Sequence, residues 1–256
     1  MVLKYSSLKE KDLDYLSFIL RHGVVTANQM MLKFREPNVY RVYRRLRKLE
    51  DRGYVKHQRI AHKVGVYYGT IEARDLTHTL VTVPTKATIY TMQHNLLMTD
   101  LILYYEFQSE KQGIGFDYQT EREIRHGVMG DGDHQSKLKA FNENRDRIPD
   151  AIFHFRSPDG RESTTWIELE LNKKDRKRYE EKFQLFEKLL SGDRMEGLIH
   201  SFHQVMYFTN DTKVQNVIHE VKKKLINGNK IVLKKIPSVI LEEKWEEVMP
   251  NGTSTP

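Results

Sequence analysis

Two acidic segments lie in the second half of the chain: Arg-Ile-Pro-Asp-Ala-Ile-Phe-His-Phe at residues 147–155 and Thr-Trp-Ile-Glu-Leu-Glu-Leu-Asn-Lys-Lys at residues 165–174. In each, apolar residues alternate around one or two acids and predict a strand, and the turn residues at 156–161 predict a hairpin between them. Successive side chains of a strand point to opposite faces, so Glu168 and Glu170 share one face. We expect this face to line a cleft while the aliphatic face packs.

Pairing of the two strands would bring the carboxylates of Asp150, Glu168 and Glu170 within a few ångströms of one another. Three carboxylates at that spacing cannot all stay ionised without a cation. The segments therefore predict a site for Mg²⁺ or Mn²⁺. The alternative is a solvated strand face on which Asp150 caps a turn.

The composition excludes several classes of site. The 256 residues include no cysteine, so there is no disulfide framework, thiolate zinc site or cysteine nucleophile. No apolar run approaches the roughly 18 residues that a membrane-spanning helix needs, and the first residues lack a signal-peptide core. We expect a cytoplasmic protein without a membrane partner.

The net charge of +7 is unevenly distributed. Residues 1–90 hold 17 Lys and Arg against 8 Asp and Glu, whereas residues 91–256 hold 25 against 27. A basic module in front of a nearly neutral one indicates polyanion binding by the first module and metal chemistry in the second. The alternative is that the basic residues only keep the first half soluble.

The N-terminal pattern predicts a winged helix-turn-helix over residues 1–84. Helices are expected at about 8–22, 27–34 and 39–52, followed by two strands that start near residues 54 and 64. The third helix of such a fold enters the major groove of double-stranded DNA, and the wing lies along the backbone. The candidate DNA contacts are Arg35, Arg41, Arg44, Arg45, Lys48 and, in the wing, Lys63. A protein-interaction module is the alternative.

Residues 85–240 predict a mixed sheet flanked by helices, and residues 241–256 a polar tail. The expected order is a helix at 86–107, a strand at 115–124, the two acidic strands, a helix at 174–190, a strand at 204–209, a helix at 214–225 and a strand at 230–233. Residues 126–147 are expected to form a loop. The fold class is therefore α+β or α/β, in two domains.

This layout resembles the PD-(D/E)xK nuclease superfamily, through Pro149-Asp150 and Glu168-Leu169-Glu170. With the winged helix in front, and with His94-Asn95-Leu96 and Thr120-Glu121-Arg122-Glu123, it resembles the replication-relaxation family of bacterial plasmids and integrative elements. The resemblance implies a restriction-endonuclease-like domain and a metal-dependent enzyme. Such an enzyme would recognise an origin on double-stranded DNA and nick one strand to start transfer or replication.

The resemblance also implies roles for individual residues. Asp150 and Glu168 would bind the metal, Glu170 stands where the superfamily usually has lysine, and Glu121 is a candidate fourth acid. Lys182 is a candidate for the missing cation. The alternative is a catalytically inactive, sequence-specific DNA-binding regulator whose second domain serves for dimerisation or partner binding. A homodimer and other replication or transfer proteins are the further candidate partners.

Overall fold

The computed structural model describes residues 8–60, 64–81, 83, 89–129, 148–192, 202–243 and 245. The described chain divides into an N-terminal unit, which ends at Leu103, and a C-terminal unit, which begins at Tyr104. Each unit combines helices with a sheet, so the fold is mixed α and β. Among the described helices, none has the length and apolar character needed to cross a membrane.

The division between the units falls inside helix α5 (Ile89–Lys111) rather than between residues 84 and 85. The first part of α5 is tied to the N-terminal helices. The Gln29 amide donates to the backbone oxygen of Leu96 at 2.9 Å, and the His22 ring lies 3.0 Å from the Thr99 hydroxyl. Sequence periodicity predicts the helix but not the unit against which it packs. The expected boundary therefore differs from the observed one.

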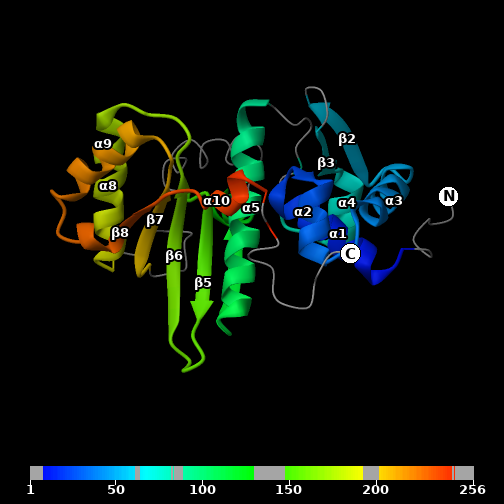
Figure 1. Ribbon diagram of the computed structural model, residues 1–256, viewed down its shortest axis with the longest axis horizontal. Helices are drawn as coiled ribbons and strands as arrows, with labels where there is room; N and C mark the ends of the chain where they lie inside the picture. The colour runs from blue at the N-terminus through cyan, green and yellow to red at the C-terminus, as the bar shows by residue number, and fades with distance from the viewer. Residues whose placement is uncertain are drawn as a thin grey trace. The chain divides into compact units, whose positions relative to one another are not determined.

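Besides the first part of α5, the described residues of the N-terminal unit form the helices α1 to α4 and a small antiparallel sheet. Figure 1 labels these elements. The elements are α1 (Glu10–His22), β1 (Val25–Thr26), α2 (Ala27–Phe34), α3 (Val39–Glu50), β2 (Val55–Ile60), β3 (Val64–Gly69) and α4 (Ile71–Thr77), with sheet order β1-β3-β2. Thr26 caps α2 by accepting from Gln29 N at 3.2 Å, and Asn38 caps α3 by accepting from Arg41 N at 3.2 Å. These caps place the helix starts where the sequence predicts them.

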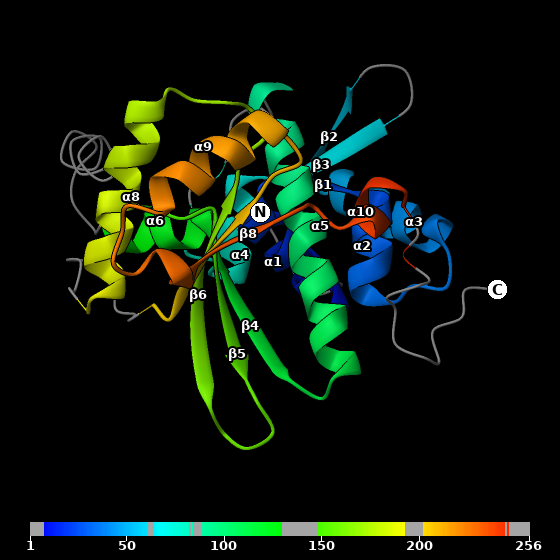
Figure 2. The same ribbon diagram turned by 60° about the vertical axis from the view of Figure 1, so that its left-hand side comes forward.

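The C-terminal unit is built on a five-stranded sheet of order β4-β5-β6-β7-β8. Its elements after α5 are β4 (Gly115–Thr120), α6 (Glu121–Met129), β5 (Ala151–Arg156), β6 (Glu162–Leu169), α8 (Arg176–Leu190), β7 (Gln204–Phe208), α9 (Thr212–Lys222), the 3-10 turn η4 (Gly228–Lys230), β8 (Ile231–Lys234) and α10 (Ser238–Leu241). The strands β4, β5 and β6 pair antiparallel, and β6, β7 and β8 pair parallel. Figure 2 shows β4, β5 and β6 running alongside one another. The predicted hairpin and mixed sheet are both present.

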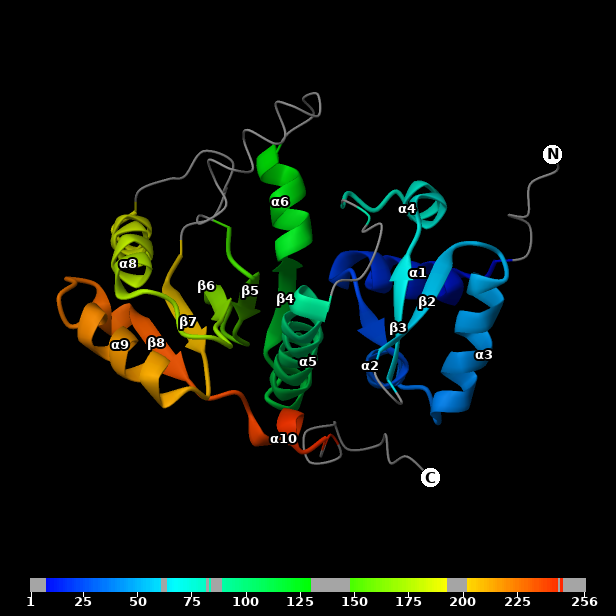
Figure 3. The same ribbon diagram turned by 90° about the horizontal axis from the view of Figure 1, so that it is seen from above.

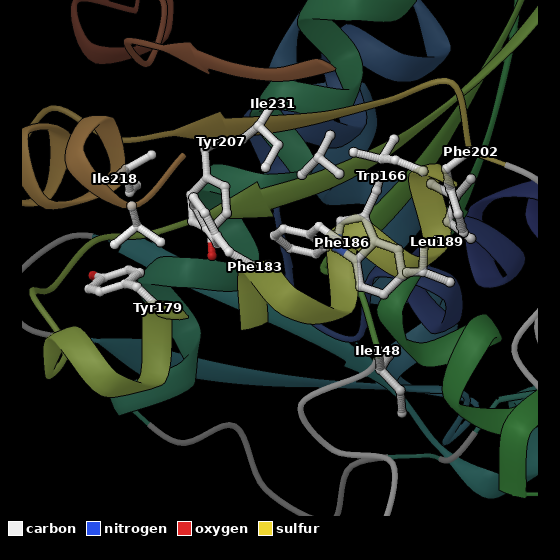
Figure 4. Close-up of a cluster of buried hydrophobic side chains, with 14 of the residues drawn as sticks. Ile148, Trp166, Tyr179, Phe183, Phe186, Leu189, Phe202, Tyr207, Ile218 and Ile231 are labelled. Carbon is white, nitrogen blue, oxygen red and sulfur yellow. The ribbon is translucent and has the colours of Figure 1, made fainter. Parts of the chain in front are cut away.

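Helices cover both faces of this sheet. Figure 3 shows α8 and α9 on one face and α5 on the other. On the α5 face, the Tyr105 ring lies 5.3 Å from the Phe153 ring and 5.9 Å from the Phe208 ring. On the α8 face, Trp166 packs against Phe186 in the cluster of buried side chains drawn in Figure 4. The expected open cleft on the glutamate side is therefore wrong for the described residues, because α8 and α9 pack there.

The strand predicted over residues 115–124 is also shorter than expected. It ends at Thr120, which starts α6 through a capping box. The Glu123 carboxylate accepts from Thr120 N at 2.9 Å, and the Thr120 hydroxyl accepts from Glu123 N at 3.4 Å. Glu121 consequently lies on a helix and not on a strand. The loop expected over residues 126–147 is wrong for residues 126–129, which belong to α6, and residues 130–147 lie outside the described residues.

Candidate active site

The hairpin register places Asp150 opposite Glu168. Ala151 faces Ile167 across the β5–β6 pair, and Asp150 N continues this pairing by donating to Ile167 O at 3.1 Å. The Asp150 carboxylate then accepts from Leu169 N at 2.8 Å. The acid after the proline is therefore held at the end of β6, beside the strand that carries Glu168.

Both carboxylate oxygens of Glu168 have partners from the chain. The side chain is only 5% exposed, its Oε1 accepts from the Trp166 indole N–H at 2.5 Å, and its Oε2 lies 2.6 Å from Lys182 Nζ. Trp166 is two residues away on β6 and so shares the face of Glu168. Lys182 comes from α8, whose core face also carries Tyr179 and Phe186. Helix α8, which covers this face of the sheet, thus places the Lys182 ammonium next to the Glu168 carboxylate.

Burial and charge act in opposite directions on this pair. Burial raises the pKa of Glu168, the Lys182 ammonium opposes that rise, and the neighbouring Asp150 carboxylate adds to it, with a net increase to about 7. For Lys182, burial alone would lower the pKa, but the carboxylates of Glu168 and Asp150 outweigh it and raise the pKa. The pKa of the Tyr207 phenol is raised by burial and then by Glu168. Asp150, Glu168, Lys182 and Tyr207 therefore form one electrostatic cluster.

The other two predicted metal ligands have different partners. Glu170 is 6% exposed and its carboxylate lies 2.7 Å from Lys174 Nζ, while the Glu121 carboxylate pairs with Arg125 one turn along α6. Glu121 approaches the site only through its backbone, by donating to Asp150 O at 3.1 Å. Within the part of the chain that the structure describes, no three His, Asp or Glu residues are grouped so that they could hold a metal ion. Of the predicted acids, the structure thus brings Asp150 and Glu168 together with Lys182, whereas Glu170 and Glu121 pair with cations of their own.

The remaining pair of acids fits a hard divalent cation in its chemistry. Mg²⁺ is commonly held by one or two carboxylates, with waters and substrate phosphates completing its shell. Asp150 and Glu168 would be those carboxylates, since they lie on neighbouring strands and on the same face of the sheet. Sequence reasoning missed Trp166 and Tyr207 as members of this site. For Trp166 a signal was available, because it lies two residues before Glu168 on β6 and so shares its face of the sheet.

In the N-terminal unit, Arg45 and Lys48 of α3 form ion pairs inside the fold. Asp12 of α1 is fully buried, pairs with Arg45, and lies 2.9 Å from Lys48 Nζ. Burial would raise the pKa of Asp12, but hydrogen bonds from Lys9 N, Lys48 and Arg45 lower it overall. The Arg45 guanidinium also lies 5.1 Å from the centre of the Tyr15 ring. The two cations predicted to contact DNA therefore hold α3 against α1.

The outward face of α3 carries other cations and two tyrosines. Arg41, Arg44 and Arg47 are exposed there, with Tyr40 at 79% and Tyr43 at 45% exposure. The buried residues of α3 lie on the opposite stripe. Sequence reasoning selected Arg41 and Arg44 but missed Arg47 and both tyrosines, which a helical projection away from the apolar stripe would have found.

The two remaining candidate DNA contacts lie outside α3. Arg35 is exposed at the end of α2, with φ of 49°. Lys63 lies outside the described residues.

No family model matches the chain, and neither a curated protein nor a solved structure gives a significant match.

Proposed function

We propose that this chain binds double-stranded DNA and nicks one strand by metal-dependent phosphodiester hydrolysis, as an origin-recognising relaxase of a mobile element would. The observation that carries the proposal is the convergence of Asp150, Glu168 and Lys182. The two acids are opposed on paired strands, and the ammonium group lies 2.6 Å from the second acid. The succession α5-β4-α6-β5-β6 and then α8-β7 among the described elements, with acids on β6 and just before β5, supports a nuclease-like domain of the PD-(D/E)xK type.

The chain's own groups have distinct roles in this reaction. A bound Mg²⁺ or Mn²⁺ would supply an activated water and charge stabilisation at the phosphate. Asp150 and Glu168 would bind it, and the Trp166 N–H would fix the orientation of the Glu168 carboxylate. Lys182 would supply the cation that the superfamily motif places at the position of Glu170, reaching the site from α8 instead of from the strand. A lysine beside the attacking water or the phosphate lowers the barrier by stabilising negative charge.

The N-terminal unit supports the DNA-binding half of the proposal. Its element order, α1-β1-α2-α3 followed by the β2–β3 hairpin, supports a winged helix-turn-helix. In that fold α3 would enter the major groove, and its exposed face carries Arg41, Arg44 and Arg47. Arginines on an exposed recognition helix provide both phosphate neutralisation and bidentate contacts to guanine.

A nicking assay tests the proposal. The substrate is a supercoiled plasmid that carries the DNA flanking the coding sequence in its native element, with Mg²⁺ or Mn²⁺ present. We expect open circles with the wild type and a loss of at least about 100-fold with Asp150→Asn, since a metal ligand is removed. Asp159→Asn, on the exposed turn of the same hairpin, is the matched control and should nick normally. Equal nicking by wild type and Asp150→Asn would refute the proposal.

A second candidate function is DNA-binding regulation without catalysis. Two observations favour it: both Glu168 oxygens already accept from donors of the chain, and Glu170 stands at the position of the motif lysine. In that case the second domain would serve for dimerisation or partner binding. Glu168→Gln separates the two functions. A nicking enzyme should lose its activity with this substitution, whereas a regulator should keep both specific DNA binding and regulation.

A further inference from the structure

The two oxygens of Glu168 differ in how easily their donors can leave. The Trp166 indole is fully buried, with its ring centre 5.5 Å from that of Phe186 and 5.1 Å from that of Phe202, so its N–H is fixed on Oε1. The Lys182 side chain is 18% exposed and ends a flexible four-carbon stem. Of these two donors, only the ammonium on Oε2 can move without disturbing the core.

A divalent cation and the Lys182 ammonium would compete for the same oxygen. A metal about 2 Å from Oε2 would lie within about 5 Å of an ammonium that is 2.6 Å from the same oxygen, so the two positive charges would repel each other. The carboxylates of Asp150 and Glu168 attract the ammonium while no metal is bound, but a divalent cation would neutralise them and repel it.

We infer that Lys182 is a resident counter-cation of Glu168, which a divalent metal must displace in order to bind. This displacement rests on the proposed metal site at Asp150 and Glu168. Lys182 therefore weakens metal binding to the protein alone. After displacement, the ammonium stays tethered to α8 beside the carboxylate pair, where an anionic phosphate oxygen can accept from it. The same residue thus opposes metal binding without DNA and favours it when a phosphate is present.

Lys174, which pairs with Glu170, provides a matched comparison. Its ammonium lies 2.7 Å from Glu170, a distance similar to that of the Lys182 pair, but its side chain is 44% exposed. Glu170 is not one of the two proposed ligands. Removal of Lys174 changes the net charge by the same amount as removal of Lys182, so it controls for the general effect of a lost positive charge.

Mn²⁺ binding by the full chain tests the displacement without DNA and without an activity measurement. Free Mn²⁺ is measured by electron paramagnetic resonance at pH 8 under argon, with wild type, Lys182→Met, Lys174→Met and Asp150→Asn. We expect Lys182→Met to bind Mn²⁺ about tenfold more tightly than wild type, because a competing buried cation is gone. Lys174→Met should stay within about twofold, and Asp150→Asn should lose binding.

The outcomes separate the displacement from the proposed function. Equal or weaker Mn²⁺ binding by Lys182→Met than by wild type overturns the displacement and leaves the proposed metal site standing. Absence of binding by all the proteins, or binding that survives Asp150→Asn, overturns both. Folding of each variant is checked by tryptophan fluorescence. Lys182→Gln, which is shorter than lysine but keeps a polar, uncharged end that can donate a hydrogen bond, carries the same expectation if Lys182→Met does not fold.

Discussion

Replacement of Lys182 by methionine should destabilise the C-terminal unit more at pH 8.5 than at pH 6. The wild-type Glu168 carboxyl has its pKa raised from 4.5 to about 7, so the folded state holds its proton more tightly than the unfolded state does. Wild-type stability from this group therefore falls as pH rises from about 4.5 to 7, by roughly 3 kcal/mol, and stays level above 7. At 5% exposure, Glu168 is little screened by solvent.

Without the ammonium, the pKa of Glu168 should rise further above 7. The free energy of unfolding of Lys182→Met then continues to fall above pH 7, by about 1.4 kcal/mol for each pH unit. The reason is that the folded variant still binds a proton on Glu168, whereas the unfolded chain has lost it. Over the 1.5 units between pH 7 and pH 8.5 the variant loses roughly 2 kcal/mol more than wild type. The raised pKa of Lys182 itself adds stability that is lost only at pH above its ordinary 10.5, outside this window.

Urea unfolding followed by tryptophan fluorescence measures this difference. Both tryptophans, Trp166 and Trp245, belong to the C-terminal unit, so the signal reports that unit alone. Lys174→Met is the control, and because its side chain is 44% exposed it should cost under about 1 kcal/mol at both pH values. If Lys182→Met loses the same free energy at pH 6 as at pH 8.5, the proposed coupling between Glu168 and Lys182 is wrong.

The remaining predictions concern the N-terminal unit. Asp12→Asn should destabilise this unit by about 2–4 kcal/mol at pH 7, because a fully buried carboxylate that pairs with two cations is lost. The lowered pKa of Asp12 gives stability that is present above the ordinary value of 3.8, so the difference from wild type should shrink as pH falls below 3.8. Hydrogen exchange of α1 and α3 amides measures it, and unchanged protection would contradict the structural role. Arg44→Gln and Arg47→Gln should each weaken DNA binding and reduce the slope of log affinity against log salt by about one; an unchanged slope in both would place the DNA elsewhere. Tyr40→Ala, at a side chain that is 79% exposed, should change stability by under about 0.5 kcal/mol and weaken DNA binding, and normal binding would remove Tyr40 from the interface.

Local patterns predicted much of the C-terminal unit. The core face of α8 follows from helical spacing, and Tyr179, Phe183 and Phe186 are buried as that spacing predicts. The β5–β6 hairpin follows from apolar alternation and the turn residues between the strands. The prediction failed where two local signals competed: the alternation after residue 115 suggested a longer strand, but the capping box at Thr120 and Glu123 started α6. Glu121 was misplaced for this reason.

The opposition of Asp150 and Glu168 was determined by the sequence itself, because the short turn between β5 and β6 sets their register and the register sets which side chains face each other. The partners of the charged side chains were decided only by the tertiary structure. Lys182 meets Glu168 from a helix 14 residues further along, and Lys48 meets Asp12 across 36 residues. Both ion pairs depend on how helices dock, and docking depends on the packing of whole faces rather than on any local pattern. The sequence could therefore predict where the acids lie along the chain, but only the tertiary structure shows that Glu168 and Asp12 already pair with lysines of the same chain.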